Sequence, residues 1–277
     1  EEENDVNYNM DNAQIQTTYD NNEQYYKDMS WNQMSVTTEI LPQAASGISK
    51  VNPSMGDVAT KAREIVSDAS KVEGTDYDAI SVGYWQPDAG NLANGGGWAS
   101  VNGLFSWMTY PHNLAVLRHE VGHNFGHPHH KKDVYEYRNS RPNLQESDGY
   151  DGFDMMSGGN GYDISHFAAA SKWFFNWIPD SSIIHMQLEG ATDNCPTCLS
   201  SGTFTLFSFD DKDVVPTPDK KMGIHIPISA AGNTLYSYWL SYRGAGVDGK
   251  AAHGLSVHVS WLSLGGTFGA IYDSLRY

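Results

Sequence analysis

The sequence predicts an α+β protein in which a region of mixed helices and strands is followed by a smaller, all-β, sandwich-like domain. In the first 180 residues, apolar residues recur at helical spacing in three stretches, with strand-like apolar runs between them. Beyond Pro179 that spacing disappears, and short apolar runs alternate with Gly and Asp turns. We therefore expect a polar N-terminal arm over 1–30, a mixed domain over 31–180 and a C-terminal β domain over 181–277.

Three main helices are expected, over 54–72, 113–125 and 164–177, because apolar residues recur in each at intervals of three and four. Ser54 begins the first stretch and Asp163 precedes the last, and both residue types are common N-caps. These positions predict where the first and the last helix begin.

Strands are expected wherever β-branched and apolar residues gather between turn residues. Such runs cover 34–41 and 78–85 in the first region, and 203–209, 223–228, 235–242 and 255–262 in the second. Asn, Asp, Gln, Glu and Tyr dominate the first 30 residues, without clear periodicity. We expect that segment to be loosely held.

Charge and composition exclude several classes of function. The 277 residues carry 17 Lys and Arg against 33 Asp and Glu, a net charge of −16, which argues against nucleic acid or an anionic membrane surface as a partner. No apolar run approaches the roughly 18 residues of a membrane-spanning helix. With 40% hydrophobic residues the chain can fill a sizeable core, which excludes a wholly disordered protein. We expect a monomer that does not insert into membranes.

The two cysteines, Cys195 and Cys198, form the run C-P-T-C. Two thiols are too few for a four-ligand structural zinc site. A redox motif would open a helix after a strand, whereas this pair lies among Thr, Asn, Ser and Gly. We expect a local disulfide in an exported protein, since disulfides persist in oxidising compartments.

Six of the 11 histidines lie between residues 112 and 130. Within this cluster stands the run His119-Glu120-Val-Gly-His123. Positions i and i+4 lie on one face of a helix, so both imidazoles can bind one metal ion while Glu120 lies beside it. This spacing predicts the first two ligands of a metal site.

The next residues can bring a third histidine to the same ion. Gly126 can adopt the left-handed conformation that ends a helix, and Pro128 prevents the helix from resuming. His129 is the third ligand that we expect, with His127 and His130 as alternatives. Three neutral imidazoles leave one position of Zn²⁺ open to water, which is typical of a catalytic site.

The run H-E-V-G-H-N-F-G-H-P-H, from His119 to His129, resembles the H-E-x-x-H-x-x-G-x-x-H signature of the metzincin zinc metallopeptidases. A chain of this composition would contain that pattern by chance only roughly 10⁻⁴ times. The resemblance covers about 34–177 and implies a mixed, mostly parallel sheet with three helices and a cleft. It also implies that His119, His123 and His129 bind a catalytic Zn²⁺ ion.

Metzincins also have a methionine in a tight turn beneath the metal, downstream of the third histidine. The run Asp154-Met-Met-Ser-Gly158 is similar to that turn, with Met156 as the turn methionine and Met155 as the alternative. Several metzincin families place a Tyr two residues after this methionine. Here that position is Gly158, so the resemblance assigns no phenol to the metal.

Among the metzincins the chain most resembles the gametolysin family, the algal cell-wall lysins. The similarity lies in H-E-V-G-H-N-F-G-H, the D-M-M-S turn, the aromatic helix that follows and the C-terminal β region. It implies a secreted endopeptidase that acts on a protein or glycoprotein substrate of the extracellular matrix or cell wall.

The matched residues imply a mechanism. Zinc lowers the pKa of its bound water to about 7 and polarises the scissile carbonyl. Glu120 is the general base that takes the proton of that water and delivers it to the leaving amine. An extended substrate would pair with an edge strand through main-chain hydrogen bonds, and residues 97–101 are the candidate edge.

Calcium is a second candidate metal. Asp148, Asp151 and Asp154 are spaced among glycines, and flexible oxygen ligands suit Ca²⁺. A solvated acidic turn explains the same residues, and Asp154 could instead orient the methionine turn.

Two other functions compete with the metzincin reading. A peptidase whose third ligand is a downstream glutamate would need Glu136 or Glu146, and it leaves Gly126 and His129 unexplained. A catalytically silent binding or adhesion module would keep the metal for structure alone. The presence of Glu120 argues against that module, because a structural site needs no base.

Overall fold

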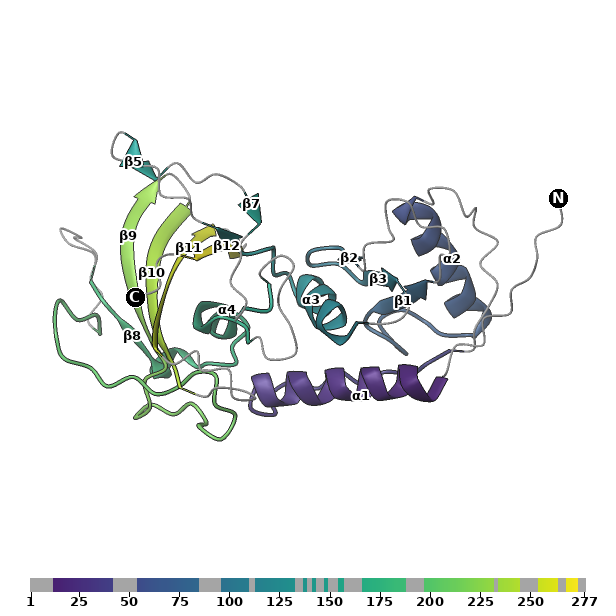
Figure 1. The fold of residues 1–277 in the computed structure, drawn as a ribbon, viewed down its shortest axis with the longest axis horizontal. Helices are drawn as coiled ribbons and strands as arrows, with labels where there is room; N and C mark the ends of the chain where they lie inside the picture. Colours follow the sequence, from purple (N-terminus) through teal and green to yellow (C-terminus); the bar gives the residue numbers. More distant parts are fainter. Residues whose placement is uncertain are drawn as a thin grey trace.

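The computed structural model is a mixed α and β protein in which two sheets lie on either side of helix α3 (Leu114–Asn124) (Figure 1). A three-stranded sheet lies at one end and a seven-stranded sheet at the other. The structure describes residues 12–41, 54–84, 96–109, 113–132, 137–138, 141–142, 147–148, 154–156, 166–187, 197–231, 234–244, 254–263 and 268–273.

The smaller sheet is mixed, as predicted for the first region. Strands β1 (Ile80–Tyr84) and β3 (Phe105–Thr109) are parallel, and β2 (Gly97–Ala99) pairs antiparallel with β3 at the edge. The predicted strand over 78–85 is therefore confirmed. The candidate edge over 97–101 is confirmed for Gly97–Ala99, whereas Ser100 and Val101 lie outside the strand.

Helix α2 (Met55–Asp68) confirms the helix predicted over 54–72. The Ser54 side chain accepts a hydrogen bond from the backbone N–H of Asp57, and the Asp57 carboxylate accepts one from the backbone N–H of Ser54. This capping box satisfies two donors at the start of the helix. The buried face of α2 packs on β1 and β3 through Val58, Ala62 and Val66.

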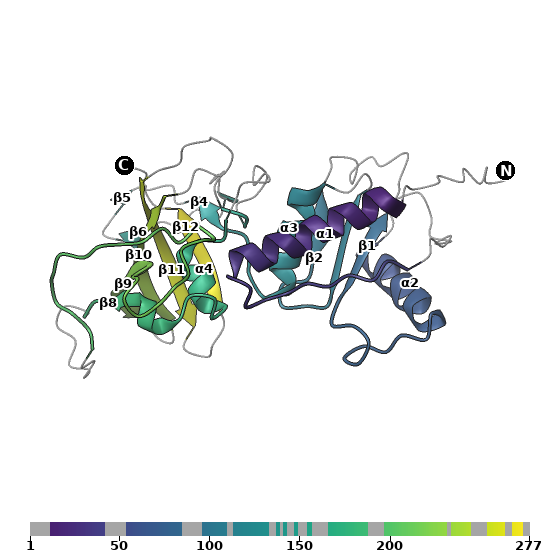
Figure 2. The same ribbon diagram turned by 90° about the horizontal axis from the view of Figure 1, so that it is seen from below.

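Helix α3 confirms the helix predicted over 113–125, and Asn113 caps it by accepting from the backbone N–H of Ala115. A further helix, α1 (Asn12–Met29), crosses beside α3 and extends toward both sheets (Figure 2). The prediction of a loosely held arm over 1–30 is wrong for residues 12–29. Apolar and tyrosine side chains recur there at helical spacing and are buried, among them Ile15, Tyr19 and Tyr26.

The larger sheet contains seven strands in the order β7-β4-β12-β11-β10-β9-β8. Its four long members form an antiparallel meander, and its short members pair at the two edges. The bounds are β4 (Lys131–Lys132), β7 (Ser147–Asp148), β8 (Ile183–His185), β9 (Gly223–Ala231), β10 (Thr234–Arg243), β11 (Gly254–Ser263) and β12 (Phe268–Asp273). A two-stranded ribbon, β5 (Tyr137–Arg138) and β6 (Arg141–Pro142), stands apart from it.

The C-terminal strands predicted over 223–228, 235–242 and 255–262 are confirmed. Residues 203–209 and 34–41 are not strands. The first run makes only an isolated bridge, from Ser208 to Tyr242 of β10, and the second has no ladder partner among the described residues. Within the described ranges this region has one sheet with α4 (Ala169–Phe174) against it, so the predicted two-sheet sandwich is not found.

Helix α4 is shorter than the helix predicted over 164–177. It begins after Ala168, and the predicted cap, Asp163, lies outside the described residues. Strands β4 and β7 precede residue 180 and yet join the larger sheet. Elements from both sides of the predicted boundary thus share one sheet.

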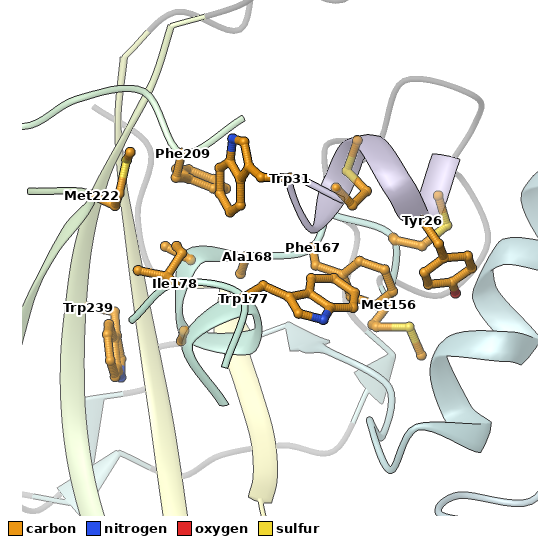
Figure 3. Close-up of a cluster of buried hydrophobic side chains, with 14 of the residues drawn as sticks. Tyr26, Trp31, Met156, Phe167, Ala168, Trp177, Ile178, Phe209, Met222 and Trp239 are labelled. Atoms are coloured by element: carbon orange, nitrogen blue, oxygen red, sulfur yellow. The ribbon is translucent and has the colours of Figure 1, made fainter. Parts of the chain in front are cut away.

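The largest core lies between this sheet and the two helices α1 and α3 (Figure 3). Trp239 of β10 is buried on the sheet side, and Tyr26 of α1 packs against Phe167 with ring centroids 6.0 Å apart. Met156 is fully buried in the same cluster, on the side of α3. The core therefore supports the underside of the helix that carries the histidine motif. Of the helices described, none has the length and apolar character needed to cross a bilayer.

Candidate metal centre

Three histidines meet beside α3. His119 and His123 lie one turn apart on this helix, and His129 returns to them from the segment that follows it. One ligand atom from each lies within 4.8 Å of the others, and the ring centroids are 4.6 to 5.0 Å apart. These three imidazoles could hold a metal ion, as the spacing of the sequence predicts.

The turn after α3 brings His129 back. Gly126 has a φ of +98°, a conformation that glycine adopts readily. Its backbone N–H donates to the carbonyl of His123 (2.8 Å), and the N–H of His127 donates to the carbonyl of Gly122 (3.2 Å). This pair of bonds is a Schellman motif, which ends the helix and reverses the chain.

Backbone carbonyls orient the two helical imidazoles. Nδ1–H of His119 donates to the carbonyl oxygen of Met155 (2.7 Å), and Nδ1–H of His123 donates to that of His127 (2.6 Å). Because a carbonyl only accepts, the proton must lie on Nδ1 in both neutral rings, and Nε2 keeps its lone pair. Hydrogen bonds of this kind are typical of metal-binding histidines.

Burial keeps these two rings neutral. It lowers the pKa of His119 to about 3 and that of His123 to about 4, and neighbouring imidazoles add to the effect. Neutral imidazole is the form that binds a metal ion. The donor set therefore suits a divalent ion of borderline softness, such as Zn²⁺.

Glu120 lies beside the three histidines with only 5% of its surface exposed. Its Oε2 has no hydrogen-bond partner among the described atoms, and burial raises its pKa to about 8. Gly97 of the edge strand β2 makes room for it, since a Cβ there would lie 2.7 Å from Glu120 Cγ and 2.8 Å from Oε1. A buried carboxyl with an unpartnered oxygen, next to a possible metal site, is a candidate for acid–base chemistry.

The methionine turn supports the helix from below. Asp154 is fully buried, and its carboxylate accepts hydrogen bonds from the backbone N–H groups of Met156 (2.8 Å) and Ala168 (2.7 Å). A Cβ on Gly122 would lie 2.6 Å from Sδ of Met156, so this sulfur lies directly beneath the H-E-x-x-H turn. This contact favours Met156 as the turn methionine, while Met155 contributes the carbonyl that binds His119.

The two alternative third ligands have other partners. His127 is fully buried, with Nε2 2.6 Å from Oγ of Ser171 and Nδ1 2.9 Å from the carbonyl oxygen of Pro128. His130 is also fully buried, and its Nδ1 lies 2.8 Å from Oδ1 of Asp154. Both imidazoles therefore serve the packing beneath the site.

Several other predicted residues lie outside the described part of the chain. Glu136, Glu146, Asp151 and Gly158 are among them, and so is Cys195, which leaves the disulfide with Cys198 a prediction. The calcium site predicted at Asp148, Asp151 and Asp154 also stays a prediction, but the carboxylate of Asp154 is already bound by other groups. Asp154 faces the methionine turn, where backbone amides bind both of its oxygens.

The sequence reasoning missed three contributors to this centre. Nothing indicated that Gly97 would make room for Glu120, although a glycine at the start of a strand marks a close approach of chains. Ser171 was also missed, and it lies 44 residues from the histidine it contacts. The third is Tyr26, whose hydroxyl donates to the carbonyl oxygen of Arg118, immediately before His119.

Neither a protein-family model, nor a curated protein sequence, nor a solved structure matched this chain when each was compared with it.

Proposed function

We propose that this protein is a zinc-dependent endopeptidase of the metzincin type. The observation that carries the proposal is the placement of Glu120, a buried carboxyl without a hydrogen-bond partner among the described residues, beside three convergent imidazoles. A metal site that served structure alone would gain nothing from an unpaired buried carboxyl, which costs free energy to bury.

The histidines His119, His123 and His129 would hold the ion. Bound Zn²⁺ would supply a Lewis acid that acidifies a water molecule and polarises the substrate carbonyl. The carbonyls of Met155 and His127 keep the proton on Nδ1 of the first two rings, so that Nε2 is available without a tautomer change.

Glu120 would act as general base and then as general acid. Its carboxylate accepts the proton of the attacking water and passes it to the nitrogen of the leaving amine. Burial raises its pKa to about 8 in the metal-free protein. A nearby dication lowers that value and restores a carboxylate at neutral pH.

The edge strand β2 would bind the substrate main chain. It is the outermost strand of its sheet and lies against α3, where Gly97 faces Glu120. An extended peptide that adds to this edge places its backbone beside the general base. Trp98 of the same strand is 37% exposed and offers an aromatic surface to a substrate side chain.

The resemblance to the gametolysin family extends this proposal to the biological setting. It supports a secreted monomer that cleaves extracellular-matrix or cell-wall glycoproteins, with a Cys195–Cys198 disulfide suited to an oxidising environment. The negative net charge of −16 favours neither nucleic acid nor an anionic membrane as a partner.

Replacement of Glu120 by Gln tests the proposal directly. The variant keeps the volume of the side chain but removes the base, and we expect gelatin cleavage to fall by at least about 10³-fold, at the upper part of the range for loss of a general base. Metal analysis should find the same zinc content as in the wild type. Glu73→Gln, at an exposed position, is the matched control and should cleave gelatin at the wild-type rate.

Two results would contradict the proposal. Equal cleavage by wild type and Glu120→Gln would remove Glu120 from the mechanism. Failure of the zinc-loaded wild type to cleave unfolded proteins or cell-wall and matrix glycoproteins would instead favour the silent binding module. That module should keep its ligand binding in the Glu120→Gln variant.

A further inference from the structure

Two further histidines lie side by side in the larger sheet, apart from the three histidines beside α3. His185 of β8 and His225 of β9 are register partners on adjacent parallel strands. Their Nδ1 atoms face each other at 3.1 Å, and the rings are nearly perpendicular at 81° with centroids 5.3 Å apart. We propose that these two imidazoles form a second metal site, which binds a divalent transition-metal ion such as Zn²⁺ through both Nδ1 atoms.

The distance between the two nitrogens fits shared coordination. Two nitrogens that bind one tetrahedral Zn²⁺ ion at about 2.0–2.1 Å lie about 3.3–3.4 Å from each other. The observed 3.1 Å between Nδ1 of His185 and Nδ1 of His225 differs from this value by only a few tenths of an ångström. The ion would lie to one side of the line between the two nitrogens, so the rings must turn until both lone pairs converge on it, and water completes the coordination.

Each outer nitrogen already has the partner that a metal-binding histidine needs. Nε2 of His185 lies 2.9 Å from Oδ1 of Asp180, and Nε2 of His225 lies 2.7 Å from Oγ of Ser237. Trp173 Nε1–H in turn donates to the same Asp180 oxygen at 3.0 Å. A carboxylate or hydroxyl behind the imidazole orients the ring and raises its basicity toward a metal.

The proton positions permit the same arrangement. Asp180 only accepts when ionised, so neutral His185 carries its proton on Nε2 and presents a lone pair at Nδ1. Without metal, His225 donates Nδ1–H to that lone pair and accepts from the hydroxyl of Ser237. With metal, the proton of His225 moves to Nε2 and donates to Ser237 Oγ, so both Nδ1 atoms bind the ion and no net proton is released.

The surroundings fix the pair while leaving it accessible. The His225 ring stacks on Trp173 at 20°, with centroids 6.2 Å apart, and lies 4.7 Å from the Trp239 ring centroid. The His185 side chain is 23% exposed, which gives an ion a route from solvent. Since β8 is the last strand at its side of the sheet, a bound ion ties this edge to β9 and stabilises it.

Metal stoichiometry of the full chain tests the proposal. After dialysis against Zn²⁺ the wild type should contain two equivalents, and His185→Ala and His225→Ala should each contain one. Asp180→Asn should weaken the second site about 10- to 100-fold while leaving the first unchanged. Asp219→Asn, at an exposed position in the same region, is the matched control and should keep both equivalents at wild-type affinity.

A second measurement guards against variants that fail to fold. In a His119→Ala/His123→Ala background, which leaves only one imidazole in the first group, Cu²⁺ added at one equivalent should give an electron paramagnetic resonance spectrum with two imidazole nitrogens. Saturating Zn²⁺ should raise the Tm of that background by about 5 °C. A single equivalent in the wild type that persists in His225→Ala would overturn the proposal and leave the pair as a hydrogen bond between strands. No Tm shift in the His119→Ala/His123→Ala background would do the same.

Discussion

Five histidines stand between residues 119 and 130, and the structure divides them into two groups that differ in their surroundings. His119, His123 and His129 converge at the surface of α3, whereas His127 and His130 are fully buried beneath it. Residue type and neighbourhood in the sequence are the same for both groups. The difference therefore arises from what each ring nitrogen contacts.

In the first group a backbone carbonyl occupies one nitrogen of His119 and one of His123, and the other nitrogen keeps its lone pair. In the second group His127 has partners at both nitrogens, Pro128 and Ser171. His119 and His123 therefore each keep one nitrogen available to a metal ion. His127 does not, because both of its nitrogens have partners.

The largest effect should separate His123→Ala from His127→Ala. Loss of His123 removes a ligand, so we expect one metal equivalent to be lost and gelatin cleavage to fall on the order of 10³-fold or more. His127→Ala keeps its backbone carbonyl, the acceptor for His123, and the folded variant should retain its metal and its activity within about threefold. Equal metal loss in both variants would show that the two groups do not differ in role.

Asp154→Ala should produce the next largest effect, on stability. The substitution leaves the N–H groups of Met156 and Ala168 without their acceptor and removes the carboxylate beside buried His130. We expect the free energy of unfolding, measured by urea denaturation, to fall by about 3 kcal/mol. Asp219→Ala, at an exposed position, should change it by less than about 0.5 kcal/mol. A loss below about 1 kcal/mol for Asp154→Ala would mean that water replaces this carboxylate.

Gly97→Ala tests the role of Glu120 separately from the role of the three histidines. The new Cβ would meet Val116 Cγ1 at 2.6 Å and Glu120 Cγ at 2.7 Å, so Glu120 must move while the histidines stay in place. We expect kcat/KM to fall on the order of 10²-fold with unchanged metal content. Gly96→Ala meets no atom within 4 Å and should cleave at the wild-type rate. A parallel loss of metal in Gly97→Ala would indicate damage beyond Glu120.

The smallest effect concerns the contact between α3 and the methionine turn. In Gly122→Ala the Cβ would meet Sδ of Met156 at 2.6 Å, and overpacking of this kind costs about 2 kcal/mol of unfolding free energy. Gly56→Ala in α2 meets only Ser54 Oγ, at 3.6 Å, and should leave stability unchanged or raise it by up to about 1 kcal/mol. In thermal unfolding, the Tm of Gly122→Ala should therefore fall, whereas the Tm of Gly56→Ala should stay at the wild-type value or rise.

The parts of the metal site that could be predicted from the sequence are those that depend on residues close together in the chain. The i, i+4 spacing of His119 and His123 and the conformation of Gly126 act within one turn of helix, and the structure places all three as expected. The roles of His127 and His130 were not predictable, since their partners lie 44 and 24 residues away. These distant contacts determine which of the neighbouring histidines have a ring nitrogen available to a metal ion.

The same distinction between local and distant contacts explains which helices and strands were predicted correctly. Helix α2 carries its own cap at Ser54 and was predicted. Residues 34–41 have strand propensity but no partner strand among the described residues, and they are irregular. Helix α1 was missed because its buried face contains Tyr19, Tyr25 and Tyr26 among polar residues. Three of the six buried residues of this helix are tyrosines, so a pattern that counts only aliphatic residues does not reveal their helical spacing.

The contacts of helix α1 and of the residues just after it also affect how late in synthesis the protein can finish folding. A ribosome releases this helix early, but the indole N–H of Trp31, just beyond it, donates to the carbonyl of Asp211, 180 residues further along the chain. Contacts between such distant residues slow folding, because the intervening chain must first be arranged. Until Phe167 and Trp177 have been synthesised, Tyr26 of α1 has only part of its partners and remains exposed to association with other chains. The nascent protein should therefore depend on chaperones for longer than its individual helices would suggest.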